Sequence, residues 1–306
     1  MSDLPATVPS VPTAAPSGAP PLLAVRGLSK QFPVYGRGFR QRVIGVIKAV
    51  DNVSFELAPG ESLGLVGESG SGKTTTARCI LRAIAPTAGE VRFRLPDART
   101  VDLAKLSDRE LKPVRQHAQM VFQDPFSALN PRMNVRDIVG EPLVIHGLAA
   151  GADLDDRVSE VLRRVGLRPE HRSRYPHAFS GGQRQRIGIA RALIMRPSLI
   201  VCDEATSALD VSVQAQVLDL LKELQREFQL TYLFVAHNLD VVRNFCDRVA
   251  VMRKGRIVEL AATPQIFAAP QHAYTKILLS AVPSPDPDVV MNFNVGEELA
   301  KLDAAG

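Results

Sequence analysis

A glycine-rich loop between an apolar run and a helical segment constrains the fold of this chain most. Residues 67–74 read Gly-Glu-Ser-Gly-Ser-Gly-Lys-Thr and fit the pattern G-x-x-x-x-G-K-[ST]. Ser62–Val66 precedes the loop as a short strand, and Thr74–Ile84 is expected to continue as a helix. Glycines let backbone N–H groups turn toward phosphate oxygens, and the helix N-terminus adds partial positive charge. The loop therefore predicts a nucleotide-phosphate cradle.

Each residue type in this loop has a use at a phosphate group. We expect Lys73 to bridge the β- and γ-phosphates and the Thr74 hydroxyl to bind Mg²⁺. A glycine-rich turn without a ligand is the alternative, and the position between a strand and a helix disfavours it. The loop residues expected to contact the nucleotide are Gly67, Ser69, Gly70, Ser71, Gly72, Lys73, Thr74 and Thr75.

An acidic pair follows a second apolar run. Leu199–Cys202 has the pattern of a buried strand, and Asp203 and Glu204 come directly after it. A carboxylate at a strand tip can hold Mg²⁺ directly or through water, so we assign Asp203 to the metal. Glu204 can polarise an attacking water as a general base. An acidic pair after a strand is weak evidence for a site by itself, and the phosphate-binding loop elsewhere in the chain strengthens it.

A Ser-Gly-Gly turn precedes another helical segment. Ser180, Gly181, Gly182 and Gln183 stand ahead of a helix expected over Arg186–Met195. Exposed N–H groups and the serine hydroxyl could form a second anion-binding helix start. The alternative is an ordinary helix start with Ser180 as its capping residue. One nucleotide does not need two phosphate cradles, so a second cradle would serve the nucleotide of another subunit.

The rest of the chain alternates strand and helix signals. Strands are expected at Leu22–Val25, Val50–Leu57, Met120–Phe122 and Tyr232–Ala236, with a hairpin of Arg248–Met252 and Arg256–Leu260 and helices at Asp153–Val165 and Val213–Phe228. Residues 130–190 read as mostly helical. This alternation predicts a parallel, layered α/β core interrupted by a helical insert. Residues 1–21 are expected to be a disordered Pro/Ala-rich leader, 22–283 the folded domain and 284–306 a tail.

Composition narrows the class of protein. The chain is 45% hydrophobic and 23% charged, which excludes wholesale disorder, and no run approaches the length of a membrane-spanning helix. The net charge of +5 is too small to indicate a nucleic-acid partner. The cluster of Arg37, Arg40 and Arg42 is either a solvated loop or a site for an anionic membrane surface. The three cysteines are far apart, which indicates a reducing, cytoplasmic setting.

Together these motifs resemble the nucleotide-binding subunits of ABC transporters, in order and spacing, over about residues 22–283. Ser180–Gln183 is similar to the signature motif of that family, and Leu199–Glu204 to its Walker B strand. The further residues that match the family pattern are Gln123 at the Q-loop, Asp210 at the D-loop, His237 at the switch position and Phe32 at the adenine-stacking position, which is most often Tyr.

The resemblance implies a P-loop NTPase (RecA-like) core with an antiparallel β subdomain and an α-helical subdomain. It implies ATP and Mg²⁺ as cofactors, with Thr74, Gln123 and Asp203 at the metal and Glu204, His237 and Gln123 as catalytic residues. It also implies a head-to-tail dimer with a second ATPase subunit, identical or different. The other implied partners are two membrane-spanning permease subunits and an extracytoplasmic solute-binding protein, with this chain at the cytoplasmic membrane face.

Several stretches are similar to the oligopeptide/dipeptide importer branch of that family. These are Lys48–Phe55, Gln123–Met133 and His272–Lys276, and the second is more like the second of the two ATPase subunits of such importers. The resemblance implies import of peptides or similar small solutes. Many relatives carry a further cysteine cluster that can hold an iron–sulfur centre. No cysteine follows Cys246 here, so we expect no such cluster.

Two other functions use similar motifs. A soluble ABC ATPase acting on nucleic acid or ribosomes usually has a long coiled coil between the Walker motifs, or two cassettes. This chain has one cassette and no heptad run at that place. A regulatory or other non-importer cassette is the second alternative. Regulatory cassettes usually lack the base or have a broken signature, and both motifs are intact here.

Overall fold

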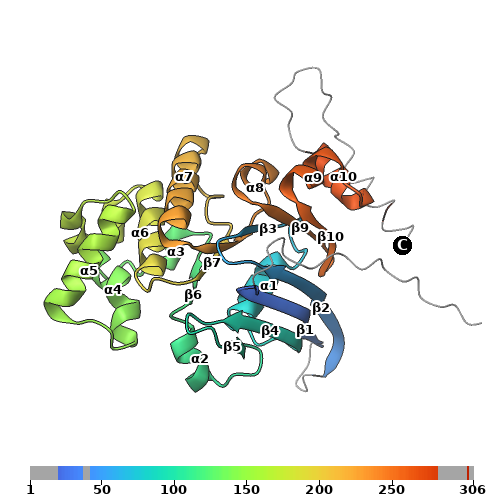
Figure 1. The fold of residues 1–306 in the computed structure, drawn as a ribbon, viewed down its shortest axis with the longest axis horizontal. Helices are drawn as coiled ribbons and strands as arrows, with labels where there is room; N and C mark the ends of the chain where they lie inside the picture. The colour runs from blue at the N-terminus through green and yellow to red at the C-terminus, as the bar shows by residue number, and fades with distance from the viewer. Residues whose placement is uncertain (1–19, 37–41, 282–301, 303–306) are drawn as a thin grey trace, which may run out of the picture.

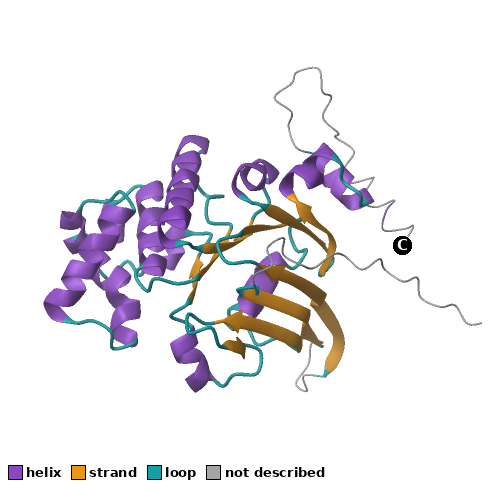
Figure 2. Ribbon diagram, viewed as in Figure 1, coloured by secondary structure: helices purple, strands orange, loops and turns teal. Residues whose placement is uncertain are grey.

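The computed structural model describes residues 20–36, 42–281 and 302 of the chain. Two β-sheets form its framework, one of four strands in the order β2-β1-β4-β5 and one of six in the order β10-β9-β3-β8-β7-β6. Figures 1 and 2 show the smaller sheet beside helix α1 and a separate group of helices at the other side of the larger sheet. Most of the expected leader, Arg37 and Arg40, and all of the expected tail but Leu302 lie outside the described residues.

The smaller sheet is antiparallel throughout. Its strands are β1 (Leu23–Tyr35), β2 (Val43–Leu57), β4 (Ala88–Arg94) and β5 (Thr100–Asp102). The strands β1 and β2 extend well beyond the predicted strands, which ended at Val25 and began at Val50. Their outer halves pair with each other while their side chains stay exposed, so the hydrophobic alternation that marks a half-buried strand is missing there.

The larger sheet holds the parallel core. Its strands are β3 (Ser62–Val66), β6 (Ala118–Val121), β7 (Leu199–Asp203), β8 (Thr231–Val235), β9 (Arg248–Arg253) and β10 (Arg256–Ala262). All pairs are parallel except β9 with β10, which form the predicted hairpin. Every residue of β3, β7 and β8 is buried, as expected for parallel strands covered on both faces.

Alternate residues of the central strands enter two different hydrophobic clusters. Leu199 and Val201 of β7 pack with the antiparallel sheet and α1 (Lys73–Ile80), whereas Ile200 and Cys202 pack with the helices of the opposite face. Those helices include α7 (Val211–Phe228) and α8 (Leu239–Phe245). The sheet is therefore one layer between two, which confirms the predicted α/β class.

Helices fill residues 130–190. They are α4 (Val135–Ile145), α5 (Gly151–Arg164), the short 3₁₀ turns Pro169–Ser173 and Pro176–Ala178, and α6 (Gly181–Leu193), preceded by α3 (Pro125–Ala128). The remaining helices are α2 (Asp108–Val114), α9 (Thr263–Ala268) and α10 (Ala273–Ser280). No helix of the described residues combines the length and hydropathy that a membrane crossing needs.

Helix α1 ends at Ile80, four residues before the predicted end. Arg82 adopts a left-handed backbone conformation with φ of 53°, which stops the helix. Its guanidinium then donates to the carbonyls of Leu103 and Leu106, at 2.8 Å and 3.0 Å. Local backbone bonds from Arg82 and Ala83 to Cys79 and Arg78 close the end of this helix, and the tertiary contacts of Arg82 add to them.

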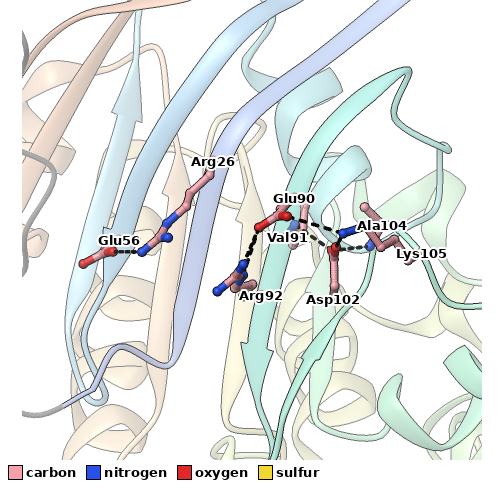
Figure 3. A network of polar contacts seen from close by, with 8 residues as sticks. All are labelled: Arg26, Glu56, Glu90, Val91, Arg92, Asp102, Ala104 and Lys105. Carbon is pink, nitrogen blue, oxygen red and sulfur yellow. Dashed lines mark hydrogen bonds and ion pairs between the residues drawn. The ribbon is translucent and has the colours of Figure 1, made fainter.

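An ion-pair network lies over β4 and β5 (Figure 3). Lys105 Nζ lies 3.0 Å from Asp102 and 3.4 Å from Glu90. Burial would raise the pKa of Asp102, but hydrogen bonds from the backbone of Val91 and from Lys105 outweigh it, and the pKa is lowered. The network fixes the turn after β5 and takes no part in the candidate site.

Candidate functional site

The loop of residues 67–74 lies between β3 and α1, as predicted. Gly67 and Gly72 have φ of 151° and 103°. A Cβ at Gly67 would lie 2.1 Å from the Met252 carbonyl oxygen, and one at Gly72 would lie 2.1 Å from that of Ala49. Backbone of β9 and β2 therefore presses on the loop from behind, and both positions require glycine.

The Lys73 side chain folds back onto its own loop. Its Nζ donates to the carbonyl oxygens of Gly67 and Glu68, at 2.7 Å and 2.9 Å. Burial lowers the pKa of this ammonium, and the nearby carboxylates of Glu204 and Asp203 oppose that effect. These carbonyls keep the cation beside the loop, from which it can reach a bound phosphate by rotation of its side chain.

Thr74 and Asp203 are in direct contact. The Thr74 hydroxyl donates to Asp203 Oδ1 at 2.8 Å, at the carboxyl end of β7. Asp203 is only 3% exposed, and burial raises its pKa although Thr74 and Arg78 oppose this. One hydroxyl and one carboxylate beside a phosphate cradle are the oxygen ligands that Mg²⁺ usually takes from a protein, so this pair fits the expected metal.

Gln123, Glu204 and His237 meet at one carboxylate oxygen. Gln123 Nε2 donates to Glu204 Oε2 at 2.9 Å, and His237 Nδ1 lies 3.0 Å from the same oxygen. The three residues follow β6, β7 and β8, which are adjacent in the sheet. The carboxyl ends of neighbouring parallel strands share one edge, and this edge brings together residues far apart in the chain.

Glu204 has a backbone conformation that is uncommon for a residue with a side chain. Its φ is 50°, and its N–H donates to the Val235 carbonyl at 2.9 Å. Beside it lies a small cavity of about 70 Å³ whose lining includes Ser207, His237 and Asn238. Glu204 therefore lines this cavity, at the edge of the sheet where the parallel strands end.

The Ser180–Gln183 turn caps α6. Ser180 Oγ accepts from the Gln183 N–H at 3.4 Å, and the Ser180 N–H donates to Gln183 Oε1 at 3.1 Å. These two bonds form a capping box. Within its own chain, Ser180 is therefore the capping residue of an ordinary helix start. Figure 1 shows α6 among the helices on one side of the larger sheet and α1 on the other. The fold does not bring this turn to the P-loop of its own chain.

Gly182 and Asp210 connect the signature turn to α7. A Cβ at Gly182 would lie 2.4 Å from a methyl carbon of Val213, so α6 and α7 begin in close contact. Asp210 caps α7, and its carboxylate accepts from the Val213 N–H at 2.9 Å and from Ser212 Oγ at 2.7 Å. These bonds, led by that from Val213, lower the pKa of Asp210.

Phe32 lies on the exposed part of β1. It is 37% exposed and pairs with Ile47, two residues before Ala49, whose carbonyl backs Gly72. Lys30 Nζ lies 4.9 Å from the ring centroid. An exposed ring on the sheet that supports the P-loop is compatible with stacking on a base.

Two contacts of the site were not anticipated from the sequence. Arg78 NH2 lies 3.9 Å from Asp203 Oδ2, and its position one helical turn after Thr74 was the available signal. The Tyr274 hydroxyl accepts the Glu68 N–H at 3.0 Å. Tyr274 belongs to the stretch His272–Lys276, which indicated the transporter branch and gave no hint of a contact with the loop.

Comparisons with known proteins agree on one family. Residues 50–207 match the family model described as ABC transporter, and 258–296 match "Oligopeptide/dipeptide transporter, C-terminal region". A putative peptide import ATP-binding protein of Brucella ovis is 52% identical over 268 residues, which cover 88% of this chain and 80% of that protein. A glutathione import ATP-binding protein of Salmonella paratyphi A is 51% identical over 87% of this chain and 42% of its own length.

The solved structures agree with the fold. The dimeric post-hydrolysis structure of the ATP-binding cassette MJ0796, bound to ADP and Pi, superposes with a TM-score of 0.66 at 30% identity. The match covers 79% of this chain and 98% of that cassette.

Proposed function

Since this chain belongs to the ABC transporter family and carries the C-terminal region of its oligopeptide/dipeptide members, we propose that it is the ATP-hydrolysing subunit of an importer for peptides or similar small solutes. The observation that carries the proposal is the meeting of Gln123, Glu204 and His237 at one strand edge next to the Thr74–Asp203 pair. The match to the C-terminal transporter region argues against an ATPase that acts on nucleic acid or ribosomes.

In this proposal, the loop 67–75 holds the phosphates of ATP and Phe32 stacks on the adenine. Thr74 and Asp203 hold Mg²⁺ with Gln123 close by, and the metal supplies positive charge to the phosphate oxygens. Lys73 turns from its carbonyl partners to the β- and γ-phosphates and offsets charge that builds up during transfer.

Glu204 acts as the general base in this proposal. Its Oε2 already accepts a hydrogen bond from Gln123 and lies beside His237, so the carboxylate is held in one orientation. A carboxylate fixed in this way can accept a proton from an attacking water. His237 is placed to contact the phosphate end of the nucleotide, and Gln123 connects the centre to the helices that follow it.

The signature turn would act on a second subunit. Because α6 and α1 lie on opposite sides of the larger sheet, Ser180–Gln183 would complete the nucleotide site of another ATPase chain and not that of its own. ATP would then bridge a head-to-tail dimer, and hydrolysis would reopen it. The partners in this proposal are a second ABC ATPase subunit, two permease subunits docked on the helices of residues 130–190, and an extracytoplasmic solute-binding protein.

The location and the solute follow from the same proposal. A subunit that drives permeases lies at the cytoplasmic membrane face. The relatives are named for peptide and for glutathione import, so a peptide or a similarly small solute fits the branch. We expect purified protein to bind ATP in the presence of Mg²⁺. We also expect it to contain no stoichiometric iron, and metal analysis tests this second expectation.

The Glu204→Gln variant tests the proposal. We expect it to bind Mg-ATP like the parent while kcat falls about 10³-fold, because general base catalysis contributes on the order of 10²–10⁴. ATPase assays and calorimetric titration measure both quantities. Glu223→Gln, on an exposed position of α7, is the matched control and should leave kcat unchanged. Turnover of Glu204→Gln at the parental rate would contradict the role given to this residue.

The same variant tests the dimer. Blocked hydrolysis should trap a closed pair, which light scattering detects as a change of mass when Mg-ATP is added. A doubled mass would mean that the chain closes on itself. A monomeric mass with ATP bound would mean that the second signature comes from a different ATPase subunit.

A further inference from the structure

A helix of the C-terminal segment contacts the phosphate-binding loop. Tyr274, in the first turn of α10, is fully buried, and its hydroxyl accepts the Glu68 N–H at 3.0 Å. Glu68 lies in the region that matches the ABC transporter model, and Tyr274 lies in the region that matches the C-terminal transporter model. The hydrogen bond therefore joins the two matched regions. This hydrogen bond joins α10 directly to the phosphate-binding loop.

The position of Tyr274 is fixed by its own surroundings. Glu259 of β10 is 8% exposed, and its carboxylate accepts the N–H groups of Gln271 and His272 at 2.8 Å and 3.0 Å. His272 Nδ1 accepts the Tyr274 N–H at 3.1 Å and caps α10. The Arg253 guanidinium lies 5.1 Å from the centroid of the Tyr274 ring. The hydroxyl is therefore held in place by contacts unrelated to nucleotide.

The bond from Glu68 links Tyr274 to Lys73 through one peptide unit. The Gly67 carbonyl and the Glu68 N–H belong to the same planar, trans peptide, so they point in opposite directions. Lys73 Nζ donates to that carbonyl at 2.7 Å, and Tyr274 accepts from that N–H at 3.0 Å. One rigid unit is thus held by Lys73 on one side and by Tyr274 on the other.

Of the two polar partners of this peptide, Lys73 is the one that must also serve the phosphates when nucleotide is bound as proposed above. An ammonium has three N–H donors, and each donor that Lys73 turns to a phosphate is lost to the loop carbonyls, whereas the Tyr274 hydroxyl has no such second task. A Cβ at Gly67 would also meet the Met252 carbonyl, so the peptide is tightly confined on that flank. A peptide free to rotate would change the direction of the following N–H groups, which form the cradle.

We propose that Tyr274 is a positioning residue that locks the Gly67–Glu68 peptide and so sets the affinity of the loop for nucleotide. The proposal rests on the function proposed above and assigns a task to the C-terminal segment: it supports the ATP site from behind. A loop that is ordered before binding costs less to order on binding. The cradle holds the phosphates before and during the reaction, so its loosening acts on binding more than on turnover.

The test is Tyr274→Phe, which keeps the ring and removes the hydroxyl. We expect the Kd for Mg-ADP, measured by calorimetry, to rise about tenfold, the upper range for one hydrogen bond. The KM for ATP should rise in parallel while kcat stays within about twofold of the parent. Tyr232→Phe is the matched control. Tyr232 is equally buried, and its hydroxyl donates to the Leu221 carbonyl at 3.1 Å, away from the loop.

The outcomes separate positioning from packing. Both variants should lose thermal stability to a similar extent, and only Tyr274→Phe should change Kd and KM. A lower Tm with parental Kd in Tyr274→Phe would overturn the inference and leave the proposed function intact. A similar rise in Kd in Tyr232→Phe would also overturn it. A parent protein that binds no Mg-ADP would overturn the proposed function, and this inference with it.

Discussion

The P-loop and the signature turn look alike in sequence but differ in how their helices begin. Both are Ser/Gly-rich and both open a helix. Helix α1 begins at Lys73, and its N-cap residue Gly72 is left-handed at φ 103° and offers no side-chain cap, whereas Ser180 and Gln183 cap α6 reciprocally. An uncapped helix start leaves the N–H groups of its first turn free to bind a ligand. At a capped start, the side chain of the capping residue already accepts a hydrogen bond from one of these N–H groups.

The difference extends to the surroundings of the two loops. The P-loop is supported from behind by its own chain: β2 and β9 back it, Tyr274 holds it, and the Thr74–Asp203 pair flanks it. The glycines of the signature turn lie against Leu209 and Val213, at and just before the start of α7, and α6 lies on the other side of the larger sheet from α1. The P-loop is therefore ordered for a ligand by contacts within its own chain. In the function proposed above, the signature turn contacts a nucleotide only when two ATPase chains associate.

Lys73→Ala should break the first half of this comparison with the largest effect. The ammonium would make two charge-assisted hydrogen bonds to phosphate, each worth about 1.5–3 kcal/mol, so affinity should fall about a hundredfold or more. Calorimetric titration with Mg-ATP measures it. Lys105→Ala removes a lysine that pairs with Asp102 and Glu90 on the other sheet and should leave affinity at the parental value. Tight ATP binding by Lys73→Ala would show that this lysine does not serve the phosphates.

Ser180→Ala should sharpen the second half. The loss of a cap costs about 1 kcal/mol of folding free energy, and monomeric chain should keep its nucleotide affinity. ATPase activity of the assembled dimer or transporter should fall about tenfold, since a hydrogen bond to a charged phosphate is lost.

The chain contains a matched control for that variant. Ser107 and Glu110 form the same capping box at α2, with the Glu110 N–H also 3.4 Å from the serine hydroxyl. Ser107→Ala should therefore lose similar stability and keep full activity. Chemical denaturation and ATPase assays of both variants test the pair. Equal activity of the two variants would mean that Ser180 is only a helix cap.

The smallest expected effect concerns pH and compares Asp203 with Asp102. Burial raises the pKa of Asp203, so its favourable contribution to nucleotide-free stability is largest at low pH and is lost as pH rises. Burial also acts on Asp102, but hydrogen bonds led by that from Val91 lower its pKa, so its contribution is present above the ordinary pKa and is lost on acidification.

Asparagine variants should therefore show opposite trends. Relative to the parent, Asp203→Asn should gain thermal stability as pH rises from about 4 to 7. Asp102→Asn should lose thermal stability relative to the parent as pH rises toward about 4 from more acidic values, and should change little above it. Thermal unfolding without nucleotide or Mg²⁺ measures both. Parallel trends would contradict the burial cost assigned to Asp203.

Local spacing determined several features of this protein without any structure. The loop 67–74 needs neighbours in sequence only, because the strand, the glycines and the helix that form the cradle are contiguous. The same holds for Asp203 and Glu204 after β7. The resemblance to a known family supplied Gln123 and His237, which no local pattern assigns, since an isolated glutamine or histidine after a strand is usually structural.

Only the tertiary structure decided how these parts meet. Gln123 and Glu204 are 81 residues apart, and they touch because β6 and β7 pair in parallel, a long-range pairing that local pattern does not encode. The extended halves of β1 and β2 exist because they pair with each other, despite exposed side chains. The bond from Glu68 to Tyr274 joins residues 206 positions apart and depends on where β10 places α10. The sequence alone determines the sites whose residues are neighbours in the chain. The packing of distant segments decides which of the other functional groups lie next to one another.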